Sequence, residues 1–407
     1  MQLYTDELGI PYNAGAEDSL TTFNRVIEAY LSSRKAVMPL LDDLIDNDPE
    51  MPLARCFRGY LLKLAADPRF TMPLLQIVKS LDQIKSSLTP REQQHVKALA
   101  SWTNNDIDTT VEILEGILTE YPRDMLALRI AHYLHFYAGA SANIRDSVAR
   151  SLAKWHQDQP FYGYLLGMHS FGLEESGDYA LAEALGKQAV DRNPDDIWAA
   201  HAVTHVYQMQ SRFDEGVPFV QSLLPVWQNA NNFLYHMHWH QALCHIGLGE
   251  ADAALAIYDS HLVRALADDF YLDICNAASL LWRLEMVGVD VGDRWDPLLV
   301  ISNARITDNE LLFSSIHYLI TPARLGDKNA TEKALANFRQ WAKSESTQGH
   351  ICRDVGLPLA EAIVDLGAGD ARRARRILTD ISDKIVLIGG SHAQRDLFNQ
   401  LREYAAA

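Results

Sequence analysis

The stretch that decides the fold lies near the middle of the chain. Residues 166–194 read LGMHSFGLEESGDYALAEALGKQAVDRNP. Ser170 and Ala182 are small residues at the two points where antiparallel helices of about 12 to 15 residues would cross. Gly177 falls in the turn between these helices, and Pro194 ends the second one. This is the tetratricopeptide spacing, and it predicts a helical hairpin.

Copies of this pattern recur along the chain. One follows about 34 residues later, with Thr204 and Gly216 at the two crossing positions. Weaker copies lie on both sides, and no run alternates over the length that a useful strand needs. We therefore predict an all-α fold, an irregular and strongly curved tetratricopeptide-type helical-repeat solenoid. We expect one continuous domain over residues 1–407, with the best-defined repeats at about 163–265 and a closing C-terminal segment at about 300–407.

Composition limits the classes of partner. The 407 residues are 48% apolar and 22% charged, which is typical of a folded globular protein. The 36 basic and 53 acidic residues give a net charge of −17, which argues against a nucleic acid partner. The start has no leader pattern and the chain has no long apolar run, so we expect no membrane association and a cytoplasmic location. Four cysteines lie far apart without a CxxC motif and fit reduced thiols. The acidic net charge neither favours nor excludes self-association, so a homo-oligomer is possible.

Histidines gather in one part of the chain. Six of the 15 histidines fall between residues 201 and 245. His201 and His205 are four residues apart, so they share one face of a helix. His236 and His240 repeat this spacing on the first helix of the next repeat. In the repeat register both pairs face the groove, and the four imidazoles are expected to converge there.

Four converging imidazoles fit more than one chemistry. They suit a divalent transition metal such as zinc, copper, nickel or iron. Residues 201–205 read HAVTH, which lacks the glutamate of the HExxH metalloprotease motif. The alternatives are a set of acid/base groups, a groove that holds an anionic ligand, or a neutral hydrogen-bonded layer of the core. The cofactor is therefore unassigned, with a divalent transition metal as the candidate.

Several longer motifs follow one another in a fixed order. They read WAAHAVTHVYQM (198–209), His236 followed by WHQAL (239–243), IYD (257–259), NAASLLWRLE (276–285), GVDVGDRW (288–295) and IGGSHAQRD (388–396). In these residues the chain resembles the tetratricopeptide repeat protein 38 family, nearly from end to end. The resemblance implies an all-helical repeat fold and a soluble, cytoplasmic protein, and it implies no reaction. Where the family tends to have glutamate, this chain has Gln208, which argues against a mechanism that relies on a carboxylate there.

One of these motifs carries polar residues that packing alone does not require. Asn276, Ser279 and Arg283 are spaced three and four apart and therefore share a helix face. A buried arginine needs a partner, and its planar fork suits a carboxylate or a phosphate. That partner is either a bound ligand or an internal ion pair with Glu285 or Asp273.

The last motif has the pattern of a helix start. Gly389 and Gly390 end one helix and Ser391 can cap the next, which leaves backbone N–H groups where an anion can sit. Gln394 and Arg395 flank this point. The alternative is an ordinary turn between helices with a serine cap.

Two classes of function follow from these patterns. We predict a pocket on the concave face that binds a small anionic molecule, with acid/base or metal-assisted catalysis left open. Aromatic residues in the histidine region, Trp239 among them, favour a pocket over an open peptide groove. The alternative is a protein-interaction scaffold that binds a peptide or a partner protein in its groove.

Overall fold

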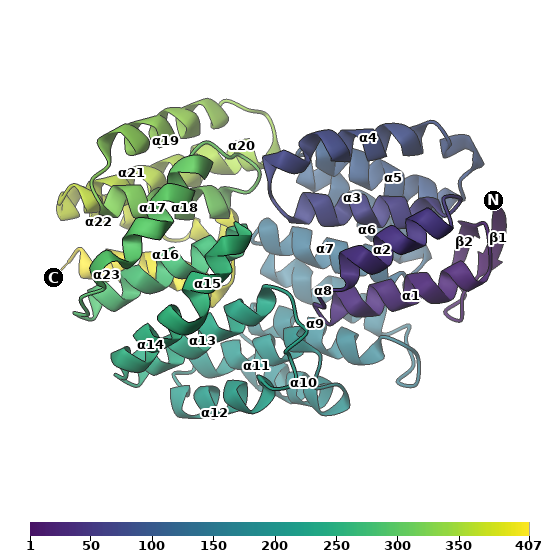
Figure 1. Ribbon diagram of the computed structural model, residues 1–407, viewed down its shortest axis with the longest axis horizontal. Helices are drawn as coiled ribbons and strands as arrows, with labels where there is room; N and C mark the ends of the chain where they lie inside the picture. Colours follow the sequence, from purple (N-terminus) through teal and green to yellow (C-terminus); the bar gives the residue numbers. More distant parts are fainter. Residues whose placement is uncertain (407) are drawn as a thin grey trace. The chain divides into compact units, whose positions relative to one another are not determined.

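The structure is a computed structural model that describes residues 1–406. Nearly all regular elements in this range are helices, which confirms the predicted all-α, tetratricopeptide-type helical-repeat fold (Figure 1). None of the helices in residues 1–406 combines the length and the apolar content that a membrane crossing requires. The four cysteines are free and buried, as expected for reduced thiols.

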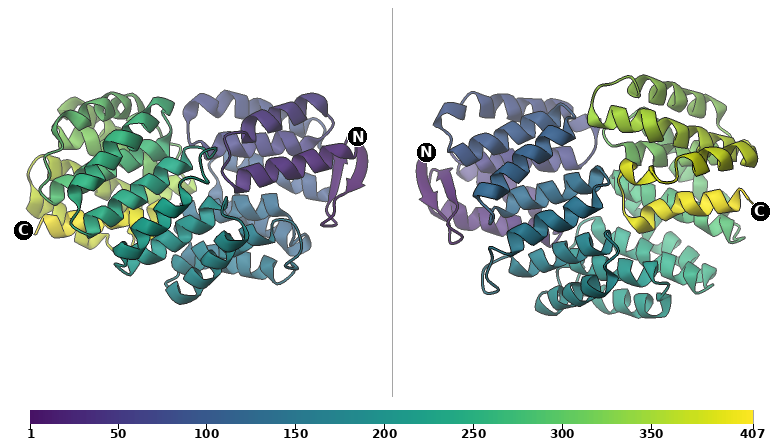
Figure 2. Two further views of the ribbon diagram at one scale, coloured as in Figure 1. Left: turned by 60° about the horizontal axis from the view of Figure 1, so that its bottom comes forward. Right: turned by 180° about the vertical axis from the view of Figure 1, so that it is seen from behind.

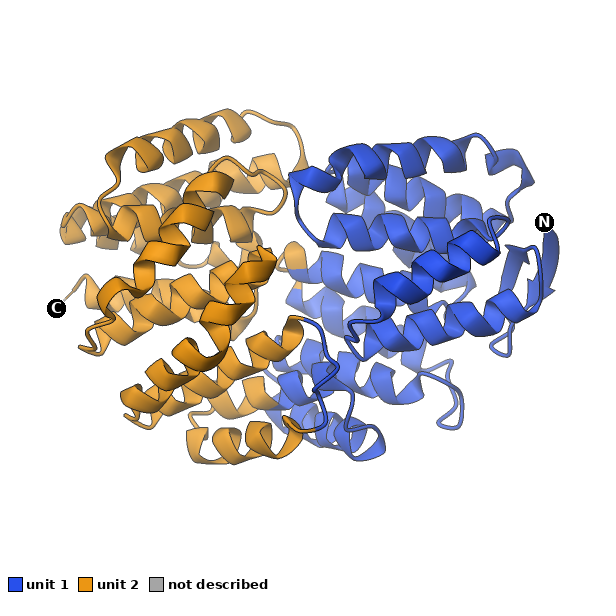
Figure 3. Ribbon diagram, viewed as in Figure 1, with its two compact units in different colours: residues 1–136, 141–203, 226–231 blue, residues 137–140, 204–225, 232–407 orange. Residues whose placement is uncertain are grey.

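The chain forms two compact units (Figure 3). Unit 1 comprises Met1–Phe136, Ser141–Val203 and Val226–Asn231, and unit 2 comprises Tyr137–Ala140, Thr204–Pro225 and Asn232–Ala407. The boundary falls inside a continuous helix, α11 (Ile197–Met209). The organisation as a single domain over residues 1–407 stays a prediction.

Unit 1 begins with a short β-hairpin, which the sequence did not lead us to expect. Strand β1 (Gln2–Thr5) pairs antiparallel with β2 (Pro11–Ala14) at the N-terminal end, drawn in purple in Figures 1 and 2. The backbone N–H and the side-chain amide of Asn13 each donate to the Glu92 carboxylate at 2.8 Å. Contacts with residues distant in the sequence therefore hold these four-residue strands, and their local pattern is too short to predict them.

The helices of unit 1 pack mainly against their neighbours in sequence, among them α1 with α2, α3 with α4, α5 with α6 and α9 with α10. Their bounds are α1 (Asp18–Leu31), α2 (Val37–Asn47), α3 (Pro52–Leu64), α4 (Thr71–Asp82), α5 (Pro90–Thr103), α6 (Ile107–Glu120), α7 (Met125–Tyr137), α8 (Ser141–Leu152), α9 (Tyr162–Glu174) and α10 (Tyr179–Arg192). Short 3₁₀ turns lie at Pro68–Phe70 and Lys85–Ser87.

The helices α9 and α10 form the hairpin that the sequence predicts. At their crossing the Ser170 hydroxyl donates to the backbone carbonyl of Ala182 at 2.6 Å, and both residues are buried. Gly177 has a φ of 83° in the turn, where a residue with a side chain would be strained. Small residues at these points let the two backbones approach, as the repeat requires.

Unit 2 continues with helices and short irregular turns. Its helices after α11 are α12 (Phe213–Leu223), α13 (Phe233–Gly247), α14 (Ala251–Ile257), α15 (Val263–Ala265), α16 (Tyr271–Met286), α17 (Trp295–Arg305), α18 (Leu312–Arg324), α19 (Lys328–Trp341), α20 (Thr347–Ile351), α21 (Leu357–Gly367), α22 (Ala371–Asp380) and α23 (His392–Tyr404). The π-helical segments are Tyr258–Leu262 and Cys352–Gly356, and 3₁₀ turns lie at Leu266–Asp268, Gly292–Arg294 and Ile385–Ile388. Helix α13 packs against α12, α14 and α16, so it is covered on several sides. Polar side chains of α13 are therefore taken into the interior of unit 2.

Candidate functional site

The histidines that the sequence singles out lie on α11 and α13. His205 on α11 and His240 on α13 are fully buried, and His236 is 3% exposed. Both helices are apolar around these residues, so the imidazoles share the interior with aliphatic and aromatic side chains. Buried imidazoles need partners, because an unsatisfied ring nitrogen costs free energy.

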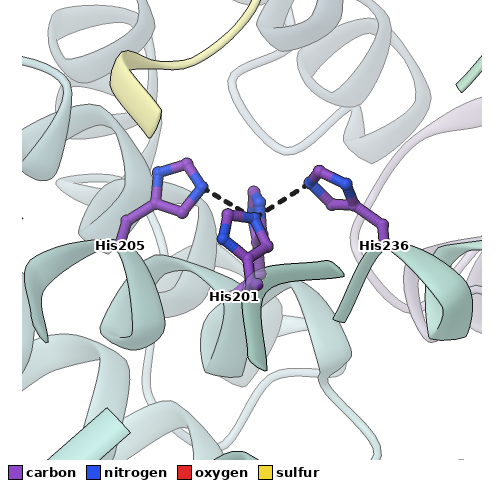
Figure 4. Close-up of side chains that lie close together, drawn as sticks. His201, His205 and His236 are labelled. Carbon is purple, nitrogen blue, oxygen red and sulfur yellow. Dashed lines mark hydrogen bonds between the residues drawn. The ribbon is translucent and has the colours of Figure 1, made fainter. Parts of the chain in front are cut away.

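Three of these imidazoles meet within unit 2 at their Nε2 atoms. Nε2 of His240 lies 3.2 Å from Nε2 of His205 and 3.0 Å from Nε2 of His236 (Figure 4). His201 lies one turn before His205 on α11 and belongs to unit 1. The predicted convergence is therefore seen for His205, His236 and His240, and the participation of His201 stays a prediction.

Gln208 fixes the tautomer of His240. The Gln208 Nε2 donates to the backbone carbonyl of His240 at 3.0 Å, so its Oε1 faces Nδ1 of the same histidine at 2.7 Å. Because an amide oxygen only accepts, Nδ1 of His240 carries the hydrogen. In the neutral ring, the lone pair is then on Nε2 of His240, the atom that faces the other imidazoles.

His236 is held in the same way from another helix. Its Nδ1 donates to Oδ1 of Asn276 on α16 at 3.0 Å, which leaves a lone pair on Nε2. The ring stacks on Trp239, with centroids 5.2 Å apart and planes inclined by 13°. Burial, and after it the positive charge that His205 can carry, lower the pKa of His236 to about 3. His236 is therefore neutral at physiological pH and available as a ligand.

The spacing of the Nε2 atoms is close to that of metal ligands. Nε2 of His240 lies 3.0 Å from Nε2 of His236, and Gln208 and Asn276 hold the Nδ1 atoms of the two rings. Nitrogen ligands of a tetrahedral zinc ion, at about 2.0–2.1 Å from the metal, lie about 3.3–3.4 Å apart. The observed separations of 3.0 and 3.2 Å are close to that spacing.

The second predicted polar group lies on α16 in the same unit. Arg283 donates to the Ser279 hydroxyl at 2.5 Å and to the backbone carbonyl of Ala393 at 2.9 Å. Its guanidinium lies 5.6 Å from the centroid of the Trp239 ring, and burial lowers the pKa of Arg283 to about 10. The alternative of an internal ion pair is wrong for residues 1–406, because Glu285 bonds to Trp295 and Arg324 and Asp273 bonds to Asn232. The role of Arg283 as a ligand-binding residue stays a prediction.

The predicted helix start at the C-terminal motif is a complete capping box. The Ser391 hydroxyl accepts from the backbone N–H of Gln394 at 3.3 Å, and the Gln394 side chain accepts from the N–H of Ser391 at 2.9 Å. Arg395 donates to the carbonyl of Gly390. These bonds confirm the serine cap. Binding of an anion by Ser391, Gln394 and Arg395 stays a prediction.

Two neighbours of the cluster have clear roles in the structure. His238 does not join it and instead stacks on His261, with centroids 3.7 Å apart and planes inclined by 6°. Gln208 is a functional residue that the sequence indicated only as a departure from a family pattern. Its position three residues after His205 places it on the adjacent turn of the same helix, but only the structure shows that it orients His240.

No family model matches the chain, so the resemblance to the tetratricopeptide repeat protein 38 family stays an expectation from sequence. A solved structure described as Naa15/Naa10 bound to HypK-THB contains a similar chain, with 12% identity over 90% of this chain and a TM-score of 0.23. The present chain spans 63% of the length of that chain. A likeness at this level carries no information about the site.

Proposed function

We propose that this protein binds one divalent transition metal ion of the zinc class through Nε2 of His205, His236 and His240. The observation that carries the proposal is the convergence of three Nε2 atoms, with that of His240 lying 3.0 Å from that of His236 and 3.2 Å from that of His205. Gln208 and Asn276 accept from the Nδ1 atoms of two of these ligands, which is the outer-shell arrangement typical of metal-bound histidine.

We further propose that the bound ion receives a small anionic molecule. Three neutral imidazoles leave the charge of a divalent ion uncompensated, and an anion at an open coordination position compensates it. Arg283 adds a second positive charge beside Trp239, which stacks on the ligand His236. An ion of this kind acts on its ligand as a Lewis acid, which is the catalysis that we propose for the site.

Metal titration tests this function directly. The chelator-treated protein is titrated with Co²⁺, and visible absorption reports the coordination geometry. We expect one ion per chain with the intense absorption of a tetrahedral site, and displacement of Co²⁺ by Zn²⁺. Absence of saturable Co²⁺ and Zn²⁺ binding in calorimetry would contradict the proposal.

Replacing Gln208 by leucine is expected to weaken metal binding without removing a ligand. The variant loses the acceptor that holds the hydrogen on Nδ1 of His240, and such outer-shell changes cost about 10–100-fold in metal affinity. The measurement is the Zn²⁺ dissociation constant by competition with a chromophoric chelator. Gln241→Leu is the matched control, because Gln241 is buried on α13 and bonds to His238 outside the cluster. Equal losses in the two variants would show that Gln208 has no specific role.

A second candidate function is a protein-interaction scaffold, and a feature of α22 favours it. Arg372, Arg375 and Arg376 are exposed on one face of this helix and line a hollow of about 670 Å³ with Thr379 and Asp380. None of the three forms an ion pair with a carboxylate among residues 1–406. In a chain with a net charge of −17, this local excess of positive charge complements an acidic peptide segment.

Charge reversal at this hollow is expected to abolish capture of an acidic peptide. A fluorescent oligoglutamate peptide should bind the wild type in a salt-dependent way and should not bind the variant R375E/R376E. The control K328E/K333E makes the same change of charge at exposed lysines of α19 and should still bind the peptide. Equal binding by all three proteins would rule out the hollow as the docking surface.

A further inference from the structure

Unit 1 contains a second buried polar group, separate from the three imidazoles of unit 2. Arg129 and His132 lie on α7, and Asp196 and Trp198 lie at the start of α11. Each of the four is at most 4% exposed. Such a concentration of ionisable side chains in an interior is costly unless each finds a partner.

The guanidinium of Arg129 packs against two adjoining aromatic rings. Its central carbon is 4.6 Å from the ring centroid of Tyr133 and 4.2 Å from that of Trp198. One nitrogen, Nη2, donates to the Tyr133 hydroxyl at 3.1 Å. The other two, Nε and Nη1, have no hydrogen-bond partner, which leaves three N–H hydrogens unsatisfied. The rings hold the guanidinium in place but supply no acceptor for these hydrogens.

Arg91, in the same unit, is a buried arginine whose charge is neutralised by a carboxylate. Its Nη1 lies 2.6 Å from Oδ2 of Asp124, and both side chains are almost completely buried. His95 bonds to the same carboxylate oxygen at 3.0 Å. Arg129 has no such carboxylate in contact among residues 1–406. Because arginine keeps its charge inside proteins, this cation lacks the counter-charge that Arg91 has.

The carboxylate of Asp196 interacts electrostatically with Arg129. Its hydrogen bond, however, is to the backbone of α11. Oδ1 of Asp196 accepts from the backbone N–H of Ala199 at 3.0 Å, in the first turn of α11, and Oδ2 has no partner. Burial raises the pKa of Asp196 to about 7, against the opposing effects of its backbone hydrogen bonds and of Arg129. This carboxyl group caps a helix and does not form an ion pair with the guanidinium.

His132 adds a second unsatisfied group on the same face of α7. It follows Arg129 by three residues, so the two side chains are neighbours on the helix surface. Neither ring nitrogen has a partner, and the ring packs against Phe171 and Trp198 with centroids 5.7 and 5.6 Å away. Burial, and then the charge of Arg129, hold the pKa of His132 well below its usual value. The neutral ring has one N–H to donate.

We propose that Arg129 and His132 bind an oxyanion, the carboxylate or phosphate group of a small molecule, within unit 1. The three free N–H hydrogens of Arg129 and the N–H of His132 match the several acceptor oxygens of such a group. Phe171 and Trp198 exclude water around it, which strengthens the charge-assisted bonds. This site uses none of the three imidazoles of unit 2, although its walls Phe171 and Trp198 also pack against His201, and binding of an oxyanion to the metal-free protein is therefore tested separately from metal binding.

Calorimetric titration with sodium phosphate and with sodium acetate, against sodium chloride at constant ionic strength, tests the proposal. We expect saturable binding of at least one of the two oxyanions by the metal-free wild type. Phosphate alone would indicate a phosphorylated ligand, and acetate would indicate a carboxylate. The variant R129Q is expected to bind about tenfold or more weakly, because it loses charged hydrogen bonds. Binding of neither oxyanion by the wild type would overturn the proposal.

Further variants keep the test decisive if R129Q fails to fold. H132F removes only the N–H donor and its lone pair and is expected to weaken oxyanion binding while circular dichroism stays that of the wild type. D196N removes a nearby acidic group and is expected to leave binding unchanged or strengthen it. The control R192Q makes the same change at an arginine that lies over Tyr162 on the surface of unit 1 and should bind like the wild type. Unchanged binding in both R129Q and H132F would place the oxyanion elsewhere and overturn the proposal.

Discussion

Replacing His240 by alanine is expected to abolish binding of Co²⁺ and Zn²⁺. Nε2 of His240 contacts both other imidazoles of unit 2, at 3.0 and 3.2 Å, so no other single residue holds the three-ligand set together. The measurement is calorimetric titration of the metal-free protein, with circular dichroism to verify the helical content. The variant should also lose the stabilisation by metal, which for the wild type amounts to about 4 kcal/mol at a free ion concentration about a thousand times the dissociation constant.

The control for this prediction is His238→Ala. His238 lies on the same helix, is 6% exposed, and stacks on His261 instead of joining the cluster. Its removal therefore deletes an imidazole from α13 without deleting a ligand. We expect H238A to bind one ion with the wild-type affinity. If H240A binds the ion as tightly as H238A does, the three imidazoles are not the ligands and their close approach has another cause.

Local spacing was enough to predict the class of fold. The small residues Ser170 and Ala182 and the turn at Gly177 specify a helical hairpin through local sterics, and the structure has that hairpin at those residues. The β-hairpin of residues 2–14 depends instead on the buried bonds between Asn13 and Glu92, which lie 79 positions apart. A pattern read along the chain does not contain a contact of that kind.

The candidate site was predictable to the level of helix faces. Spacings of four placed His201 with His205 and His236 with His240, because side chains one turn apart share a face. The approach of α13 to α11, and therefore the distance between their imidazoles, depends on the packing of both helices. The role of Gln208 depends on the orientation of one amide group, which no spacing specifies.

The oxyanion site shows why buried arginines are hard to interpret from sequence. Arg129 lies among apolar residues of α7, whereas Arg91 lies in the polar first turn of α5, and neither local sequence shows which arginine meets a carboxylate. Arg91 meets the carboxylate of Asp124, which lies 33 positions later, whereas Arg129 meets two aromatic rings. Only the three-dimensional contacts reveal which of the two cations lacks a counter-charge. The spacing of Arg129 and His132, three residues apart on an otherwise apolar helix, was the one available signal.

Replacing Gly367 by alanine is expected to destabilise unit 2 strongly. Gly367 ends α21, and a Cβ atom there would lie 2.0 Å from the backbone oxygen of Ala323 in α18 and 2.6 Å from its carbonyl carbon. Backbone atoms in a packed helix do not move aside as a flexible side chain does, so α18 and α21 must separate. We expect a loss of about 3 kcal/mol in the free energy of unfolding, measured by urea denaturation followed by circular dichroism.

Gly116→Ala is the matched control for this crossing of helices. Gly116 lies within α6, and a Cβ atom there meets nothing within 4 Å. Alanine favours the helical conformation over glycine, so this variant should gain about 0.5–1 kcal/mol. The two substitutions add the same methyl group and differ only in what that group meets. Changes of opposite sign in the free energy of unfolding would therefore show that backbone contact between α18 and α21 determines the result. Stabilisation of both variants would mean that these helices do not pack at Gly367.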